Sequence, residues 1–190
     1  MNRRNFLMRS AAGAATGLAT AAVGGMAGYI PSAYAQPAAQ PAAGSPDANQ
    51  KLSLVGFDDN ENRIIRLENF AGKVCLISFF TSACNLCNRD LKLMREFYVR
   101  NKKKDFMLIG VNMDDSKTDF DDYKRLVNLS VPKEQSFPIL WRKGQEYVDT
   151  FGTIKQKPTH FVLDKSHKLM FRREGSFLPD DWDTLWTKIS

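Results

Sequence analysis

The stretch KVCLISFFTSACNLCNRD, residues 73–90, decides the fold of this chain. Its first part, residues 73–80, is a nearly continuous apolar run, which predicts a strand that is buried on both faces. After the second cysteine, apolar residues recur at helical spacing, and they predict a helix that runs to about Asn101. Cys84 and Cys87 therefore lie where a buried strand ends and an amphipathic helix begins.

This position predicts that the two cysteines are chemically active. Free N–H groups and the positive end of the helix dipole stabilise a thiolate in the first turn, so we expect a lowered pKa for Cys84. The spacer of two residues puts Cys87 one turn further along, within bonding reach. We predict that Cys84 is the nucleophile and that Cys87 resolves the mixed disulfide. The alternatives are a static disulfide or two inert core thiols, and the third cysteine, Cys75, is interpreted as a packing thiol.

The first 35 residues indicate export. Arg3 and Arg4 are adjacent, Phe-Leu and an uncharged Ala/Gly-rich stretch follow, and residues 33–35 have the small-x-small pattern of a cleavage site. A twin arginine in this context is typical of a Tat-type signal. We predict a signal peptide over residues 1–35, cleaved after Ala35, and a periplasmic mature protein. An uncleaved membrane anchor is the alternative.

The amino-acid composition changes after the leader, which is the predicted signal peptide over residues 1–35. Residues 36–50, QPAAQPAAGSPDANQ, are rich in proline and alanine and predict a tether, so the folded domain is expected over residues 51–190. The leader contains three arginines and no acidic residue, so removing it reduces the formal charge from +6 to about +3. This mild charge does not indicate a nucleic-acid partner.

The pattern across the domain predicts an α/β fold. Residues 51–57 and 63–67 flank a turn-rich segment and predict a hairpin, and residues 106–112 predict a second buried strand. The remaining predicted elements are a helix over 117–128, a short strand over 136–141, a helical turn over 145–152, strands over 158–164 and 168–175, and a helix over 179–189. This order predicts a sandwich with a central mixed β-sheet flanked by helices and an N-terminal β-hairpin.

Three segments resemble a known family: LENFAGKVCLISFFTSACNLC (67–87), VNMDD (111–115) and FGTIKQKPTHFVLDKSHKLMFRREG (151–175). Together they are similar to exported thiol–disulfide oxidoreductases of the TlpA/ResA type, which have a thioredoxin-like fold. The resemblance covers about residues 51–190 and implies that fold and that activity for this chain.

The resemblance also implies roles for individual residues. Cys84 and Cys87 match the reactive pair, and Pro158 matches a cis-proline that presents backbone to an extended substrate. Asp90 falls where many relatives have glutamate; at i+3 it shares a helix face with Cys87 and is expected to move protons for it, the alternative being a solvated helix charge. Lys157 precedes the proline and is expected to face the pair and stabilise the Cys84 thiolate, the alternative being a surface lysine.

The sequence departs from the family pattern near the motif. Ala83 stands where relatives usually have tryptophan, and no proline lies between the two cysteines. Both differences leave the reduction potential and the partner open. The two histidines, His160 and His167, are interpreted as structural residues.

The leading functional hypothesis is an oxidoreductase that needs no cofactor, reduces client disulfides and receives electrons from a membrane thiol donor. In the family, clients include apocytochrome c and copper-centre proteins. A copper-handling protein that binds Cu(I) through the same cysteines is the alternative. A closed zinc site is not expected, because no second cysteine pair or close histidine pair completes four ligands. A peroxidase of the peroxiredoxin type is disfavoured, because TSACNLC lacks a lone cysteine beside a Pro-x-x-x-Thr/Ser loop.

Overall fold

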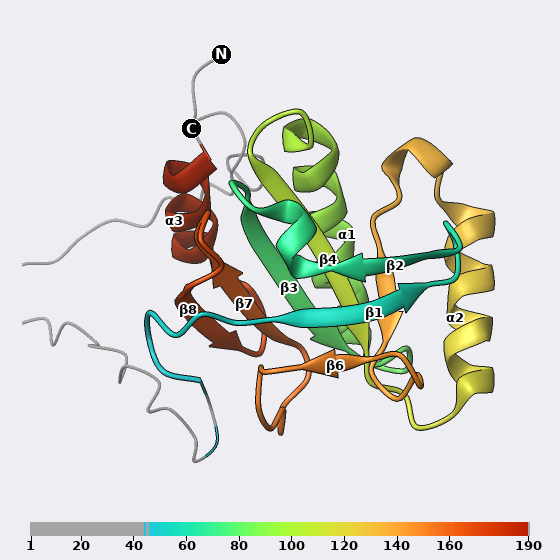
Figure 1. Cartoon of the computed structure of the whole chain (residues 1–190). Coiled ribbons are helices and arrows are strands. Elements are labelled where there is room, and N and C mark those ends of the chain that lie inside the picture. The colour runs from blue at the N-terminus through green and yellow to red at the C-terminus, as the bar shows by residue number, and fades with distance from the viewer. Residues whose placement is uncertain (1–43, 45, 190) are drawn as a thin grey trace, which may run out of the picture. The chain divides into compact units, whose positions relative to one another are not determined.

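The computed structural model describes residue 44 and residues 46–189. Its centre is a five-stranded mixed sheet with the order β5-β4-β3-β7-β8 (Figure 1). β3, β4 and β5 are parallel, whereas β7 is antiparallel to both β3 and β8. The elements are β1 Leu54–Asp58, β2 Arg63–Arg66, η2 Leu67–Phe70, β3 Val74–Phe80, α1 Asn85–Asn101, β4 Phe106–Asn112, α2 Lys117–Ser130, η3 Lys133–Gln135, β5 Ile139–Trp141, β6 Val148–Asp149, β7 Thr159–Leu163, β8 Leu169–Glu174 and α3 Pro179–Ile189. The predicted α/β sandwich with a mixed sheet and an N-terminal hairpin is confirmed.

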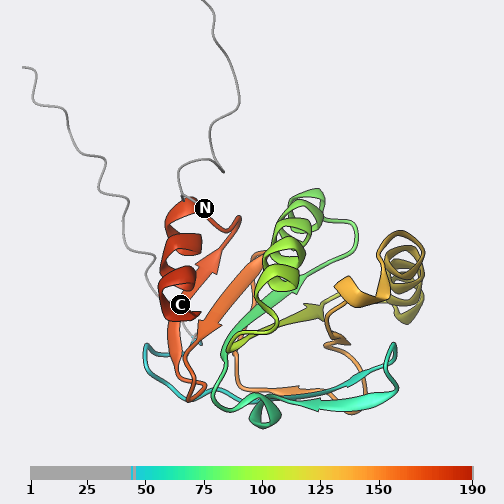
Figure 2. The same ribbon diagram turned by 90° about the horizontal axis from the view of Figure 1, so that it is seen from above.

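The central strands are covered on both faces, as their apolar sequences predict. Every residue of β3, β4 and β7 is buried. Helices α1 and α3 lie over one face of the sheet, and strands β1, β2 and β6 lie over the other (Figure 2). Because two layers cover the sheet, strands without polar alternation are stable in its middle.

Each face of the sheet has its own core. On the side of the small second sheet, the rings of Phe79, Phe151 and Phe161 form three pairs with centroids 4.8–5.5 Å apart. On the side of α1, a second apolar cluster includes Cys87, Leu91 and Met94 of that helix and Leu185 of α3. The redox motif therefore begins a helix that is fixed to the sheet by its buried face.

The predicted helical turn over residues 145–152 is wrong. Part of this segment is the short strand β6, which pairs with β1 through Leu54↔Asp149 and Val55↔Val148 and extends the hairpin to a three-stranded sheet of order β2-β1-β6. A two-residue strand has no periodicity of its own, and its conformation is set by a partner almost a hundred residues earlier.

Two residues just before the predicted domain boundary make hydrogen bonds to the folded domain. Asn49 and Gln50 were assigned to the tether, but the Asn49 N–H donates to the Leu169 carbonyl and the Leu169 N–H donates to the Gln50 carbonyl, each at 2.9 Å. The predicted signal peptide and most of the predicted tether lie outside the described residues. Within the part of the chain that the structure describes, no helix is long and apolar enough to cross a membrane.

Candidate functional site: a disulfide at the start of α1

Cys84 and Cys87 form a disulfide with their Cα atoms 5.2 Å apart. Cys84 is the N-cap residue of α1, with extended backbone angles, and its Sγ accepts a hydrogen bond from the Cys87 N–H at 3.1 Å. Sulfur thus takes the place that a serine or aspartate oxygen has in most helix caps. The same N–H groups and the helix dipole are positioned to stabilise a Cys84 thiolate after reduction.

The two cysteines differ in exposure. Cys87 is fully buried in the apolar cluster beneath α1, whereas Cys84 is only partly buried. The third cysteine, Cys75, is fully buried in β3, and burial raises the pKa of its thiol to about 12. A buried, protonated thiol is unreactive, which agrees with the interpretation of Cys75 as a packing residue.

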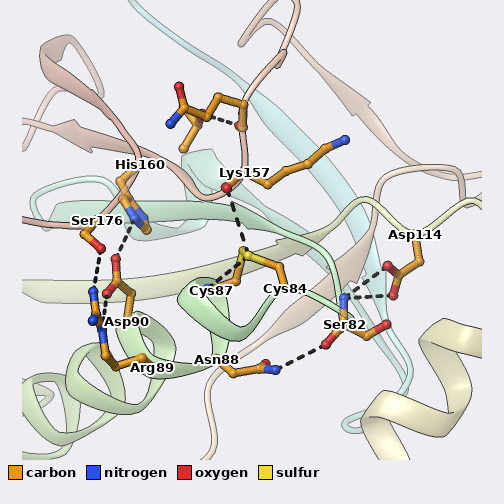
Figure 3. Close-up of a disulfide and its surroundings, with 12 residues drawn as sticks. Ser82, Cys84, Cys87, Asn88, Arg89, Asp90, Asp114, Lys157, His160 and Ser176 are labelled. Atoms are coloured by element: carbon orange, nitrogen blue, oxygen red, sulfur yellow. Dashed lines mark hydrogen bonds and ion pairs between the residues drawn. A yellow bond between two sulfur atoms is a disulfide. The ribbon is translucent and has the colours of Figure 1, made fainter.

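The segment before β7 lies directly against the disulfide. The Lys157–Pro158 peptide bond is cis, and the Lys157 carbonyl oxygen lies 4.0 Å from Cys84 Sγ. Figure 3 shows this carbonyl directed at the sulfur, while the Lys157 side chain leads away from the disulfide. The contact that Lys157 makes with the pair therefore comes from its backbone. Its exposed ammonium group lies nearer Asp115, whose pKa is lowered mainly by the hydrogen bond and charge of Lys143 and to a lesser extent by the charge of Lys157.

Asp90 is buried, with 2% of its surface exposed, so it is not the solvated helix charge that was the alternative. Its Oδ2 accepts a hydrogen bond from the Phe177 N–H at 3.0 Å and faces His160 Nε2 at 3.5 Å. Burial raises the pKa of this carboxyl, but the interactions with His160, Phe177 and Arg89 outweigh burial, and the net shift of the pKa is downward. Asp90 thus joins α1 to the loop before α3 as a buried carboxylate.

Asp114 supports the other side of the motif and was not among the predicted site residues. Its carboxylate accepts a hydrogen bond from the Ser82 N–H, two residues before Cys84, at 3.1 and 3.2 Å to its two oxygens. Asn112 Nδ2 donates to the same carboxylate at 2.8 Å, and Trp141 Nε1 donates to the Asp114 carbonyl at 2.9 Å. These contacts, partly visible in Figure 3, fix the loop that presents Cys84.

A sequence signal for Asp114 existed. It lies two residues after the end of β4, and the carboxyl ends of the parallel strands β3 and β4 lie at the same edge of the sheet. A polar residue after one such strand is therefore a neighbour of the loop that leaves the other. Within the described residues, the structure does not bring three or more potential metal-ligating side chains together at any place.

The chain has a Cys-x-x-Cys pair at the start of a helix, a cis-proline beside the pair, and a mixed sheet of the order given above. These features together define the thioredoxin-like class of proteins. Comparison with known sequences agrees: residues 45–172 match the AhpC/TSA family, so the chain belongs to that family. The match covers both cysteines, the cis-proline, strands β3, β4, β5 and β7, and most of β8.

Among curated proteins, the chain is similar to the thiol–disulfide oxidoreductase ResA of Bacillus thuringiensis, with 26% identity over 132 residues, 70% of this chain and 72% of the relative. ResA of Geobacillus thermodenitrificans is 25% identical over 66% of this chain and 68% of its own length. The disulfide and these relatives place the chain among thiol–disulfide oxidoreductases.

Solved structures confirm the fold. A putative thiol:disulfide interchange protein DsbE from Chlorobium tepidum superimposes with a TM-score of 0.58 at 21% identity, covering 76% of this chain and 96% of that one. StoA from Bacillus subtilis gives a TM-score of 0.54 at 17% identity over 74% of this chain and 99% of that one.

Proposed function

We propose that the protein is an exported oxidoreductase that reduces specific client disulfides through Cys84 and Cys87. The observation that carries this proposal is the arrangement of one partly exposed and one fully buried cysteine at the N-terminus of α1. A client can reach the sulfur of Cys84. The sulfur of Cys87 is shielded from solvent and from clients, and it can react only with Cys84.

The reaction proceeds in two exchanges. The Cys84 thiolate attacks a client disulfide, so that a Cys84–client bond forms and one client thiolate leaves. The Cys87 thiolate then attacks Cys84 Sγ, the Cys84–Cys87 bond forms, and the second client thiolate leaves and is protonated by solvent. The client disulfide gains two electrons and the cysteine pair loses them, and a membrane thiol donor restores the dithiol by the reverse exchanges.

Pro158 and the Lys157 carbonyl flank the sulfur at which the client arrives. A cis-proline presents its neighbouring backbone to an extended chain, and we propose this role for Pro158. The Lys157 carbonyl also favours a reductant, because its partial negative charge lies near Cys84 Sγ and disfavours the thiolate there. A less stable thiolate makes the couple more reducing. The proposed clients are apocytochrome c or copper-centre proteins, as in the resembling family.

The reduction potential of the Cys84–Cys87 couple tests the direction of electron flow. We expect the purified protein, equilibrated against a series of dithiothreitol buffers, to have a potential more negative than that of glutathione, together with catalysed reduction of a protein disulfide. A potential well above that of glutathione would make the protein an oxidant. If the reduced protein binds Cu(I) tightly but never exchanges with a disulfide, the copper-handling alternative takes its place.

Export is proposed from the leader. We expect the protein isolated from its own cell envelope to begin at Gln36, and a variant with both Arg3→Lys and Arg4→Lys to stay in the cytoplasm at full length. Mass spectrometry of the N-terminus and fractionation check both results. Normal export of the double variant would exclude the Tat route, and an intact leader on exported protein would indicate a membrane anchor.

A further inference from the structure

His160 is a buried titratable residue that the two exchanges above do not use. It lies in β7 with no exposed surface, and its register partner on β3 is Ser78. Both side chains point to the face of the sheet that α1 covers. The His160 Nδ1 and Ser78 Oγ atoms have no hydrogen-bond partner among the residues that the structure describes. Burying a polar imidazole without hydrogen bonds costs free energy of folding, so a buried histidine of this kind is a candidate for a functional role.

The Asp90 carboxylate faces this imidazole. Asp90 Oδ2 is 3.5 Å from His160 Nε2, and the Phe177 ring closes the other side with its centroid 5.5 Å from the imidazole centroid. Figure 3 shows Asp90 and His160 side by side, on the same side of the disulfide. This approach is longer than a good hydrogen bond, and it places the carboxylate next to the imidazole.

The other charges around this pair are compensated. Arg89, on α1, lies 3.7 Å from Asp90 Oδ1 and is mostly exposed, where it donates to Ser176 Oγ at 2.8 Å. Arg173, the register partner of His160 on β8, donates two hydrogen bonds of 2.8 Å to Asp181 of α3. The charge of Arg173 is therefore neutralised by Asp181. Asp90 is the anion that faces His160.

Asp90 also connects this imidazole to the redox pair. It follows Cys87 by three residues on α1, so the thiol and the carboxylate share the buried face of the helix. Its lowered pKa makes Asp90 alone a poor place to keep a proton near neutral pH. Imidazoles as a class titrate between about pH 5 and 8, and therefore hold a proton there far better than an ionised carboxylate does.

We propose that His160 accepts, through Asp90, the proton that Cys87 loses in the resolving step. This inference rests on the proposed function. Cys87 S–H gives up its proton, the carboxylate passes it on to the imidazole, and the Cys87 thiolate attacks Cys84 Sγ. The Cys84–Cys87 bond forms as the Cys84–client bond breaks, and the electron pair of that bond leaves on the client sulfur. The imidazolium later loses its proton to solvent.

The two exchanges can be timed separately with dithiobis(nitrobenzoate). The reduced protein releases one nitrothiobenzoate when Cys84 reacts and a second when Cys87 closes the disulfide. In His160→Gln we expect the first phase to be unchanged and the second to slow at least about tenfold at neutral pH. In the native protein the rate of the second release should increase with pH between about pH 5 and 8, where imidazoles as a class titrate. In His160→Gln it should rise only where the Cys87 thiol itself ionises.

The matched control is His167→Asn. His167 is the other histidine of the chain, is buried in the turn between β7 and β8, and has a positive φ of 61° that asparagine tolerates. We expect both phases of this variant to match the native protein. Identical pH profiles for His160→Gln and native protein would overturn the role of His160, and so would an equal slowing of both phases. A native protein that releases only one nitrothiobenzoate would instead disprove the proposed function.

A measurement on the native protein does not depend on the folding of a variant. With only two histidines, proton NMR can follow both ring signals through a pH titration of the oxidised and the reduced protein. We expect the His160 ring signals to follow different curves in the two redox states, because a nearby thiolate acts on the charge of the imidazole. The His167 curves should coincide. Coinciding His160 curves in the two redox states would contradict the proposal.

Discussion

In Cys87→Ser, mixed disulfides with client proteins should accumulate, whereas Cys84→Ser should form none. Cys84 is the partly exposed N-cap sulfur that a client can reach, and Cys87 is fully buried behind it. Without the resolving thiol, the Cys84–client bond has no intramolecular attacker and persists. Both variants should lose catalytic turnover down to the uncatalysed rate, but only one should capture partners.

The experiment needs acid-quenched cell-envelope extracts, non-reducing electrophoresis and mass spectrometry of the captured species. Cys75→Ala is the matched control, because it removes a cysteine from the chain but leaves the redox pair intact. It should retain turnover and capture nothing. Equal capture by Cys84→Ser and Cys87→Ser would mean that the two sulfurs are interchangeable and that the assignment of a nucleophile is wrong.

The sequence alone predicts the elements whose conformation is set by their own residues, such as long apolar runs or a repeated helical spacing of apolar residues. The apolar runs of β3 and β4 and the helical spacing around Cys87 set the central strands and α1. The observed bounds of the two strands and the observed end of α1 differ from the predicted ones by at most a residue. The strand β6 could not be predicted in this way. Its two residues, Val148 and Asp149, adopt their conformation because β1 offers hydrogen-bonding partners from the far end of the domain.

The same distinction applies to the site. Cys84, Cys87 and Pro158 are marked by spacing and by residue type. His160, in contrast, reads as an ordinary strand residue, and its meaning comes from contacts with Asp90 and Phe177, which lie on other elements. Lys157 shows a further limit: the sequence places the residue beside the proline, but only the structure shows that its carbonyl, and not its ammonium, faces the sulfur.

The loop before Cys84 should loosen when Asp114 is replaced. The buried Asp114 carboxylate accepts hydrogen bonds from the Ser82 N–H and from Asn112 Nδ2. Asp114→Ala leaves both donors without this partner, and each unsatisfied buried polar group costs about 1–3 kcal/mol. We therefore expect the free energy of unfolding to fall by about 2–4 kcal/mol, measured by urea denaturation of the oxidised protein.

Asp115→Ala is the matched control for this prediction. The neighbouring carboxylate is 91% exposed and pairs with Lys143 on the surface, so its removal should leave the free energy of unfolding close to that of the native protein. In Asp114→Ala, release of the second nitrothiobenzoate should also slow, because the Ser82 amide no longer holds Cys84 at the start of α1. If both alanine variants unfold at the same urea concentration, Asp114 does not anchor the loop. If only the stability falls and the closure rate is native, α1 alone positions the disulfide.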